Sequence, residues 1–260
     1  MSRDIWDPVV YGRYAGERAR PFFELISRVR AESPEYVVDL GCGSGELTAT
    51  LAERWPDARV HGVDSSPAMI DRAPDGPVTF TVGDVRSWRP ERPVDVIVSN
   101  ALLQWVPEHR ELLARWAESA LRPGGWLAFQ VPGNFDAPSH RLVRQLCASD
   151  AWRDELGDLA RYAPVGDPED YLALLAGLGC EVDAWETTYV HVLAGEDAVL
   201  NWIMGTALRP ILDRIGADPA RRAAFLAECA RMLAEAYPRR PYGTLFPFRR
   251  IFVVARTPVA

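Results

Sequence analysis

The chain has 260 residues, enough to bury a large core, and a formal net charge of −7. Apolar residues make up 48% and charged residues 25%, which is ordinary for a globular enzyme. The acidic balance argues against a general nucleic-acid binder, which usually presents a basic face. No apolar run approaches the length of a membrane span. We therefore expect no nucleic-acid partner and no membrane partner, and the oligomeric state stays open.

Cysteines and histidines are scattered along the chain and show no metal-ligand spacing. The start of the chain, MSRDIWDPVVYGRY, lacks the apolar region of a signal peptide. These features predict a cytoplasmic protein without a bound metal. The residues concerned are Cys42, Cys147, Cys180, Cys229, His61, His109, His140 and His191.

Strands and helices are expected to alternate after an aromatic-bearing lead segment at residues 1–16. Pro21 favours a helix that starts about there, within ARPFFELISRVRA. A second helix is expected in ELTATLAERW and a later one in DPEDYLALLAGLG, stopped by Gly179. The alternation implies a parallel sheet that binds ligands at the carboxyl ends of its strands. The expected strands are 36–40, 59–64, 78–82, 95–100, 126–131, 180–192 and 249–256.

The run VVDLGCGSG at residues 37–45 carries the strongest functional signal. Apolar residues lead to Asp39, and then Gly41, Gly43 and Gly45 alternate before an amphipathic helix. Such a run ends a buried strand and lets the backbone approach a ligand closely. The pattern therefore predicts a nucleotide-binding turn.

The ligand is expected to be S-adenosylmethionine rather than a dinucleotide. The spacing is G-x-G-x-G instead of G-x-G-x-x-G, and Asp39 occupies a position that is apolar in most dinucleotide folds. A carboxylate there repels a pyrophosphate but suits a ligand with an ammonium and a sulfonium group.

Two further acids end the next two strands. Asp64 follows the glycines by about 20 residues, where an acid takes ribose hydroxyls. Asp84 closes VTFTVGD and could accept the adenine amino group, with the Val85 amide facing the ring. The alternative is that Asp64 and Asp84 only cap the helices that follow them.

At this point the chain resembles the class I S-adenosylmethionine-dependent methyltransferases. The resemblance covers residues 30–135 and rests on the glycine turn, the acids in order, and LRPGGWLAFQVP. It implies an α/β, Rossmann-like, doubly wound and mostly parallel seven-stranded sheet with an antiparallel last strand. The implied cofactor site also includes Ser65 and Asn100.

Two segments exceed this minimal fold, at residues 132–166 and 194–243, and both look helical. Insertions of this length are usually functional, so we expect them to cap the ligand edge of a single domain spanning 1–260. The alternative is that they extend the core or form a dimer face.

The whole chain also resembles the trans-aconitate methyltransferases, which esterify one carboxylate of a small tricarboxylic acid. The resemblance rests on WDPVVY, GERARPF, SNALLQWVPEH, VPGNFDAPSH, VDAWETTYVH and FPFRRIFVVAR. A carboxylic acid, with a pKa near 4, is ionised at neutral pH. Its methylation needs alignment and a dry site, with no general base, so no catalytic side chain is expected.

A polyanionic acceptor needs cationic and hydrogen-bonding groups. Arg250 is favoured over its neighbour Arg249, and Arg209 is a second candidate, although each could be a solvated surface charge. His191 and Tyr189 share a strand face and could donate to a carboxylate, or could simply pack. The remaining candidates are Gln104, Trp105 and Asn134 for the acceptor, Tyr11 and Tyr14 as residues folding over the cofactor, and Arg18 or Arg20 for the cofactor's carboxylate.

Three other functions stay open. The enzyme could methylate another small acid or a natural-product hydroxyl. The chain could instead be a non-catalytic S-adenosylmethionine-binding module, although the roomy expected cap argues against it. An NAD-dependent oxidoreductase is disfavoured by Asp39.

Overall fold

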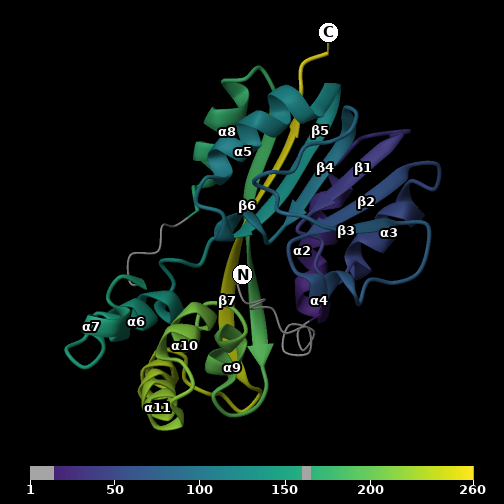
Figure 1. Cartoon of the computed structure of the whole chain (residues 1–260). Helices are drawn as coiled ribbons and strands as arrows, with labels where there is room; N and C mark the ends of the chain where they lie inside the picture. The colour runs from purple at the N-terminus through teal and green to yellow at the C-terminus, as the bar shows by residue number, and fades with distance from the viewer. Residues whose placement is uncertain (1–14, 160–164, 260) are drawn as a thin grey trace. The chain divides into compact units, whose positions relative to one another are not determined.

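The computed structural model describes residues 15–159 and 165–259, in which seven strands form one sheet (Figure 1). The strands are β1 (Tyr36–Leu40), β2 (Arg59–Asp64), β3 (Thr79–Val82), β4 (Val94–Asn100), β5 (Leu121–Pro132), β6 (Glu181–Leu193) and β7 (Thr244–Arg256). Their order across the sheet is β3-β2-β1-β4-β5-β7-β6. β1 lies next to the centre, which is where its glycine turn was expected to serve a ligand.

The first five strands are parallel, and β7 is antiparallel to β5. This confirms the predicted Rossmann-like sheet with its antiparallel last strand. β1 is buried along its whole length, because both faces of a parallel sheet are covered. The near-continuous apolar run that predicted this strand has the same cause.

Helices and short turns connect the strands. α5 and α8 cover one face of the sheet (Figure 1), where Trp116 and Tyr171 pack in one core with Phe129. α2 packs against β5 and α3 against β2. The elements are α2 (Ala15–Ser27), α3 (Glu46–Arg54), α4 (Pro67–Ile70), η1 (Leu103–Trp105), α5 (His109–Arg115), η2 (Trp116–Ala120) and α8 (Pro168–Ala176).

Element ends differ from the sequence-based expectation at several points, including β5, which begins at Leu121 rather than at residue 126. α2 begins at Ala15, so Pro21 lies inside the helix, which tolerates the proline ring at the loss of one backbone hydrogen bond. β7 begins at Thr244, several residues before the expected start. α8 ends at Ala176, and Gly179 then adopts a positive φ of 81° in the turn toward β6.

The described residues divide into two compact units. Unit 1 is drawn from Met1–Pro132, Val165–Thr187 and Arg250–Ala260, and unit 2 from Gly133–Pro164 and Thr188–Arg249. Unit 2 contains the two expected insertions, which are helical as predicted: α6 (Pro138–Cys147), α7 (Arg153–Leu156), α9 (Ala198–Met204), α10 (Arg209–Ile215) and α11 (Pro219–Ala236). That these helices cap the ligand-binding edge of the sheet stays a prediction.

Unit 2 has its own aromatic core. Trp202 packs against Phe246 and Phe248, with ring centroids 5.7 and 5.6 Å away. Tyr237 packs on Phe246 at 5.5 Å and accepts a hydrogen bond from the Ser139 backbone N–H at 3.0 Å. These contacts join α6, α9, α11 and the first part of β7.

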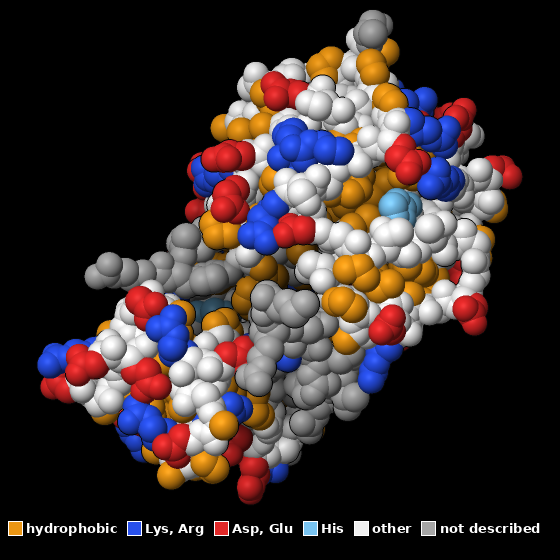
Figure 2. Space-filling model, in the orientation of Figure 1, with side chains coloured by type: hydrophobic (Ala, Val, Ile, Leu, Met, Phe, Trp, Pro, Cys, Tyr) orange, Lys and Arg blue, Asp and Glu red, His pale blue; other side chains and the backbone are white. Residues whose placement is uncertain are grey.

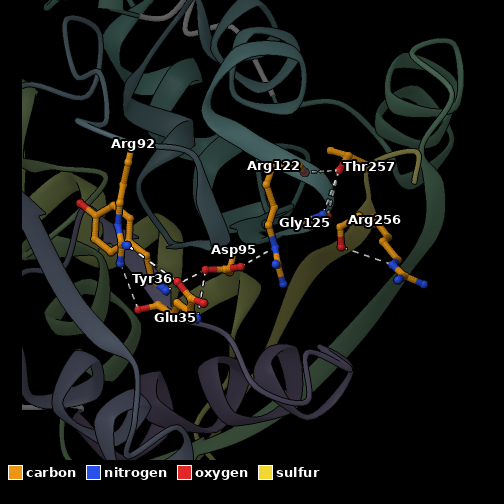
Figure 3. A network of polar contacts seen from close by, with 9 residues as sticks. Glu35, Tyr36, Arg92, Asp95, Arg122, Gly125, Arg256 and Thr257 are labelled. Atoms are coloured by element: carbon orange, nitrogen blue, oxygen red, sulfur yellow. Dashed lines mark hydrogen bonds and ion pairs between the residues drawn. The ribbon is translucent and has the colours of Figure 1, made fainter. Parts of the chain in front are cut away.

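The amino ends of the parallel strands are joined by a polar network around Asp95 (Figure 3). The buried Asp95 carboxylate accepts from the backbone N–H of Glu35 and Tyr36, at 3.0 and 2.8 Å, and forms an ion pair with Arg122. Nearby, Thr257 donates to the Arg122 carbonyl at 2.8 Å. The network connects β1, β4, β5 and the end of β7 at the edge opposite the carboxyl ends of the parallel strands.

On the face shown in Figure 2, acidic and arginine side chains alternate, and the described residues there form no continuous basic patch. Among the helices of residues 15–159 and 165–259, none is both long and apolar enough to cross a bilayer.

Candidate functional site

The three glycines of the turn between β1 and α3 have two different roles. Gly41, Gly43 and Gly45 all have positive φ, at 81°, 57° and 76°. A Cβ on Gly41 would come within 2.7 Å of Leu102, and one on Gly45 within 2.5 Å of the Phe80 ring. Among the described residues, a Cβ on Gly43 would meet nothing within 4 Å. Gly41 and Gly45 thus permit close packing, whereas Gly43 borders open space that a ligand can occupy.

Asp64 connects this turn to the end of β2. Its Oδ2 accepts from the Gly43 backbone N–H at 2.9 Å, and its Oδ1 accepts from the Ser66 N–H at 2.9 Å. The cap of α4 is Ser66, whose hydroxyl accepts from Met69, and Ser65 is exposed beside it. Asp64 therefore lies beside the open glycine, and its contact with ribose hydroxyls stays a prediction.

Asp39 is a buried carboxyl group beneath the turn. Its Oδ2 accepts from the Thr48 hydroxyl at 2.6 Å, and its Oδ1 has no hydrogen-bond partner among the described residues. Burial raises the pKa of Asp39 to about 7, with the Thr48 hydrogen bond opposing the shift and the Asp64 charge adding to it. A buried carboxylate oxygen without a partner fits a cationic ligand group.

Asp84 lies two residues after the end of β3 and is held within its own turn. Arg86 donates to both carboxylate oxygens, at 3.0 Å from Nε and 2.5 Å from Nη2, and lowers the pKa of Asp84 chiefly through this hydrogen bonding. The Arg86 N–H also bonds Oδ1 at 2.9 Å. The capping alternative thus describes part of what Asp84 does. Val85 is buried in the core, and an adenine contact at either residue stays a prediction.

Four polar residues lie on one face of the sheet, on four neighbouring strands. Asp39 pairs with Val98 across β1 and β4, and Asn100, two residues further, pairs with Gln130 across β4 and β5. β7 continues the row, because Arg250 pairs with the residue two beyond Gln130. Residues two apart on a strand share a face. The row runs Asp39, Asn100, Gln130, Arg250 near the carboxyl ends of β1, β4 and β5.

Along the row, the buried side-chain atoms that lack a partner among the described residues are acceptors on β1 and β4 and a donor on β5. Asn100 Oδ1 and Gln130 Nε2 are both buried and have no partner within the described part of the chain. Arg250 is 5% exposed, and its Nη1 donates to Gln130 Oε1 at 3.0 Å. Arg249, the next residue in β7, alternates to the other face.

Gln130 was missed from the sequence, although a signal was available. It is the one polar residue in the apolar stretch LAFQV, and it is fully buried. Buried polar side chains are nearly always hydrogen-bonded, so an amide in such a strand indicates a specific partner.

The chain turns sharply after β4, at the predicted acceptor residues. Ala101 has a positive φ of 56°, and its carbonyl accepts from Gln104 Nε2 at 2.6 Å. Trp105 follows in η1 and is partly buried. Strained backbone at the carboxyl end of a strand is common at ligand sites.

The other acceptor candidates belong to unit 2 and are described within it. Asn134 is buried; its Oδ1 accepts from the Arg249 N–H at 2.7 Å, and its Nδ2 has no partner in the described residues. His191 packs on Trp202 at 4.8 Å and on Tyr189 at 6.3 Å, which gives both residues the packing role considered above. Arg209 begins α10.

Of the lead-segment candidates, only Arg20 belongs, with its side chain, to the described part of the chain. Tyr11 and Tyr14 lie outside the described residues, as does the side chain of Arg18. Arg20 is exposed and forms an ion pair with Glu24 at 2.7 Å. Among the described His, Cys, Asp and Glu residues, no group of three or more could hold a metal ion.

Comparisons with known proteins show the family to which the chain belongs. Residues 12–184 match a family described as "Methyltransferase domain". A trans-aconitate 2-methyltransferase of Rhodococcus jostii is 56% identical, over 97% of this chain and 99% of the relative. Relatives of the same name are 52% identical in Streptomyces coelicolor, over 97% of this chain and 87% of the relative, and 48% in Mycobacterium tuberculosis, over 96% of both.

Solved structures share the fold at low sequence identity. The YcgJ protein of Bacillus subtilis superposes with a TM-score of 0.58 at 14% identity, covering 93% of this chain and 99% of that one. A phosphoethanolamine N-methyltransferase of Haemonchus contortus, in complex with S-adenosylhomocysteine, gives a TM-score of 0.54 at 16% identity, covering 92% and 52%.

Proposed function

We propose that this chain, which belongs to the trans-aconitate 2-methyltransferase family of methyltransferases, forms a monomethyl ester on one carboxylate of trans-aconitate, in the cytoplasm, with S-adenosylmethionine as the methyl donor. The observation that carries the proposal is the row from Asp39 to Arg250. It has a carboxyl group at one end and a guanidinium at the other, with two amides between them.

The residues around the glycine turn fit the donor. Among the described residues nothing occupies the space over Gly43, and we assign Asp64, beside this glycine, to the ribose hydroxyls. Asp39 Oδ1 and Asn100 Oδ1, which have no partner in the described part of the chain, can accept from the donor's ammonium group. We assign Ser65, Asp84 and Val85 to the same site. When bound, S-adenosylmethionine supplies an electrophilic methyl group on a sulfonium.

The acceptor end of the row has the opposite charge. Arg250 offers a buried guanidinium, and such a group binds a carboxylate through paired N–H donors. The acceptor's carboxylate is ionised at neutral pH, so no residue of the chain has to remove a proton. The chain's contribution is to hold the oxygen in line with the methyl group and to exclude water. We include Gln104, Trp105 and Tyr11 among the acceptor-side residues.

The helices of unit 2 are proposed to complete the acceptor site as a cap on the catalytic sheet. Their candidate contacts are Asn134, whose buried Nδ2 needs an acceptor, and Arg209. His191 is the weakest candidate because its ring already packs in the aromatic core.

A labelled-methyl assay tests the function. Purified protein, S-adenosylmethionine carrying a labelled methyl group and trans-aconitate should give a base-labile methyl product that mass spectrometry identifies as a monomethyl ester. A panel of other small acids, phenols and amines runs in parallel. A phenol or amine as the only acceptor contradicts the proposal. Donor binding by calorimetry without turnover on any acceptor would indicate a binding module.

A further inference from the structure

We propose that Gln130 determines acceptor specificity: its Oε1 positions the Arg250 guanidinium, and its Nε2 donates a hydrogen bond to the bound polycarboxylate. This inference rests on the proposed function and assigns a role to a residue that was not among the candidates predicted from the sequence. Three observations support it, namely the burial of both side chains, the neutrality of the amide and the position of Gln130 in the row.

Burial makes the orientation of Gln130 specific. The side chain is fully buried in β5, and the bond from Arg250 Nη1 to Oε1 at 3.0 Å fixes which end of the amide faces the arginine. The Nε2 end is then left with its hydrogens and with no partner among the described residues. A buried donor without an acceptor is unfavourable, so a ligand oxygen that reaches Nε2 gains a strong hydrogen bond.

Because the Gln130 amide is neutral, it does not cancel the positive charge of Arg250 that would attract a polyanionic substrate. An amide oxygen can hold the guanidinium in one orientation without cancelling its positive charge. A carboxylate at the same position would bind the guanidinium more strongly, and it would also repel a polyanion. Glutamine is therefore a residue type that orients Arg250 without cancelling its positive charge.

The position in the row separates Gln130 from the donor site. Within residues 15–159 and 165–259, the acceptor atom Oδ1 of Asn100, which pairs with Gln130 across β4 and β5, has no partner, and neither has the hydrogen-bond donor Nε2 of Gln130. Anionic oxygens are thus favoured on the side of β5 and β7, and cationic N–H groups on the side of β4 and β1. Loss of Gln130 should affect the acceptor and spare the methyl donor.

Two substitutions test the role. Gln130→Met keeps the volume and removes both hydrogen bonds. Gln130→Glu keeps an oxygen that accepts from Arg250, but it removes the N–H group that would bind the substrate and adds a negative charge. We expect Gln130→Met to raise KM for trans-aconitate about 10- to 100-fold, and Gln130→Glu to raise it further. Neither should change kcat by more than a few-fold, or the calorimetric Kd for S-adenosylmethionine by more than twofold.

Ser99→Ala is the matched control. Ser99 precedes Asn100 in β4, is fully buried, and donates to the Leu40 carbonyl at 3.0 Å. Its loss removes one buried hydrogen bond of the same sheet, so it should lower Tm without raising KM for the acceptor.

The outcomes separate this inference from the proposed function. If wild-type protein methylates trans-aconitate and Gln130→Met lowers Tm as Ser99→Ala does, with KM within twofold, Gln130 is structural and the inference is wrong. If Gln130→Met weakens S-adenosylmethionine binding as much as it raises KM for trans-aconitate, the inference is also wrong. If the wild type esterifies no carboxylate of the panel, the proposed function and this inference both fail.

Discussion

The carboxyl group of Asp39 is buried in a place where ionisation is costly, and this gives the protein a pH-dependent property. Because burial raises the pKa of Asp39 to about 7, the folded chain binds a proton that the unfolded chain releases near pH 4. The contribution to stability is complete below pH 4 and is lost as pH rises through 7. We expect Asp39→Asn to stabilise the protein relative to wild type by up to about 3 kcal/mol more at pH 8 than at pH 5. Urea unfolding at both pH values measures this.

The same proton competes with a cationic donor. S-adenosylmethionine binding should weaken as pH falls below 7, by up to about tenfold per pH unit, since Asp39 must ionise to hold the cation. In Asp39→Asn the affinity should be lower and flat between pH 5.5 and 8. A wild-type affinity that does not vary with pH contradicts a direct role for this carboxylate.

Asp64 should bind the donor's ribose. Asp64→Ala is expected to weaken S-adenosylmethionine binding by about 1–3 kcal/mol, the range for a hydrogen-bonded charged group. Because Asp64 also holds the Gly43 N–H, Asp64→Asn serves as the comparison that retains an oxygen for the turn. Calorimetric titration gives both affinities. Unchanged affinity in Asp64→Ala removes Asp64 from the ribose role.

At the scale of the turn, two glycines should respond differently to the same change. Gly45→Ala places a methyl group 2.5 Å from the Phe80 ring in addition to a positive-φ backbone, so we expect a loss of unfolding free energy of about 2–4 kcal/mol. Gly43→Ala meets no neighbour among the described residues and should cost about 1–2 kcal/mol, from backbone strain alone.

The two glycine variants should rank in the opposite order when S-adenosylmethionine affinity is measured instead of stability. The Gly43→Ala methyl group enters the space assigned to the ligand, so its S-adenosylmethionine affinity should fall more than that of folded Gly45→Ala. Thermal unfolding and calorimetry on the same preparations decide this. Equal losses of stability would argue against the packing role of Gly45.

The polar network at the amino ends of the strands should stabilise the sheet rather than serve the site. Asp95→Asn removes the charge that pairs with Arg122 and is expected to lower the free energy of unfolding by about 1–3 kcal/mol. The matched control is Glu91→Gln, whose partner Arg59 lies 3.8 Å away at the surface and should contribute less than about 1 kcal/mol. Similar urea midpoints for the two variants would contradict this role.

Parts of the fold were predictable because their causes are local. β1 and β2 occupy the expected residues, since valines and an acid near the carboxyl end mark each one, and β1 is in addition buried along its whole length. The start of β7 was missed because Pro247 interrupts its pattern and its first residues alternate between the core of unit 2 and solvent. Strand ends that depend on a distant partner leave little trace in their own sequence.

The candidate site shows the same division. Asp39, Asp64 and the glycines are recognisable by spacing, but the adjacency of Asn100, Gln130 and Arg250 depends on register between strands far apart in the chain. Leu102 and Phe80, which require glycine at positions 41 and 45, are equally non-local. Sequence spacing therefore identified the donor end of the row far better than the acceptor end.

At the scale of the whole molecule, the proposed cap makes a prediction for hydrogen exchange. Adding S-adenosylhomocysteine with trans-aconitate should slow amide exchange in α6 and α9 of unit 2, besides the glycine turn of unit 1. S-adenosylhomocysteine alone should protect the glycine turn only. Protection confined to unit 1 in both experiments would contradict a substrate role for the helices of unit 2.

The opposite charges at the two ends of the row also bear on turnover. Esterification consumes one positive charge on sulfur and one negative charge on oxygen, so the spent donor is a neutral thioether and the product carries one anionic group fewer. The ammonium group that Asp39 is proposed to bind stays charged, but the acidic end of the row loses its attraction for the sulfonium, and the attraction of Arg250 for the ester weakens in the same event. Both products should depart more readily than the reactants that preceded them, without any moving part being needed to expel them.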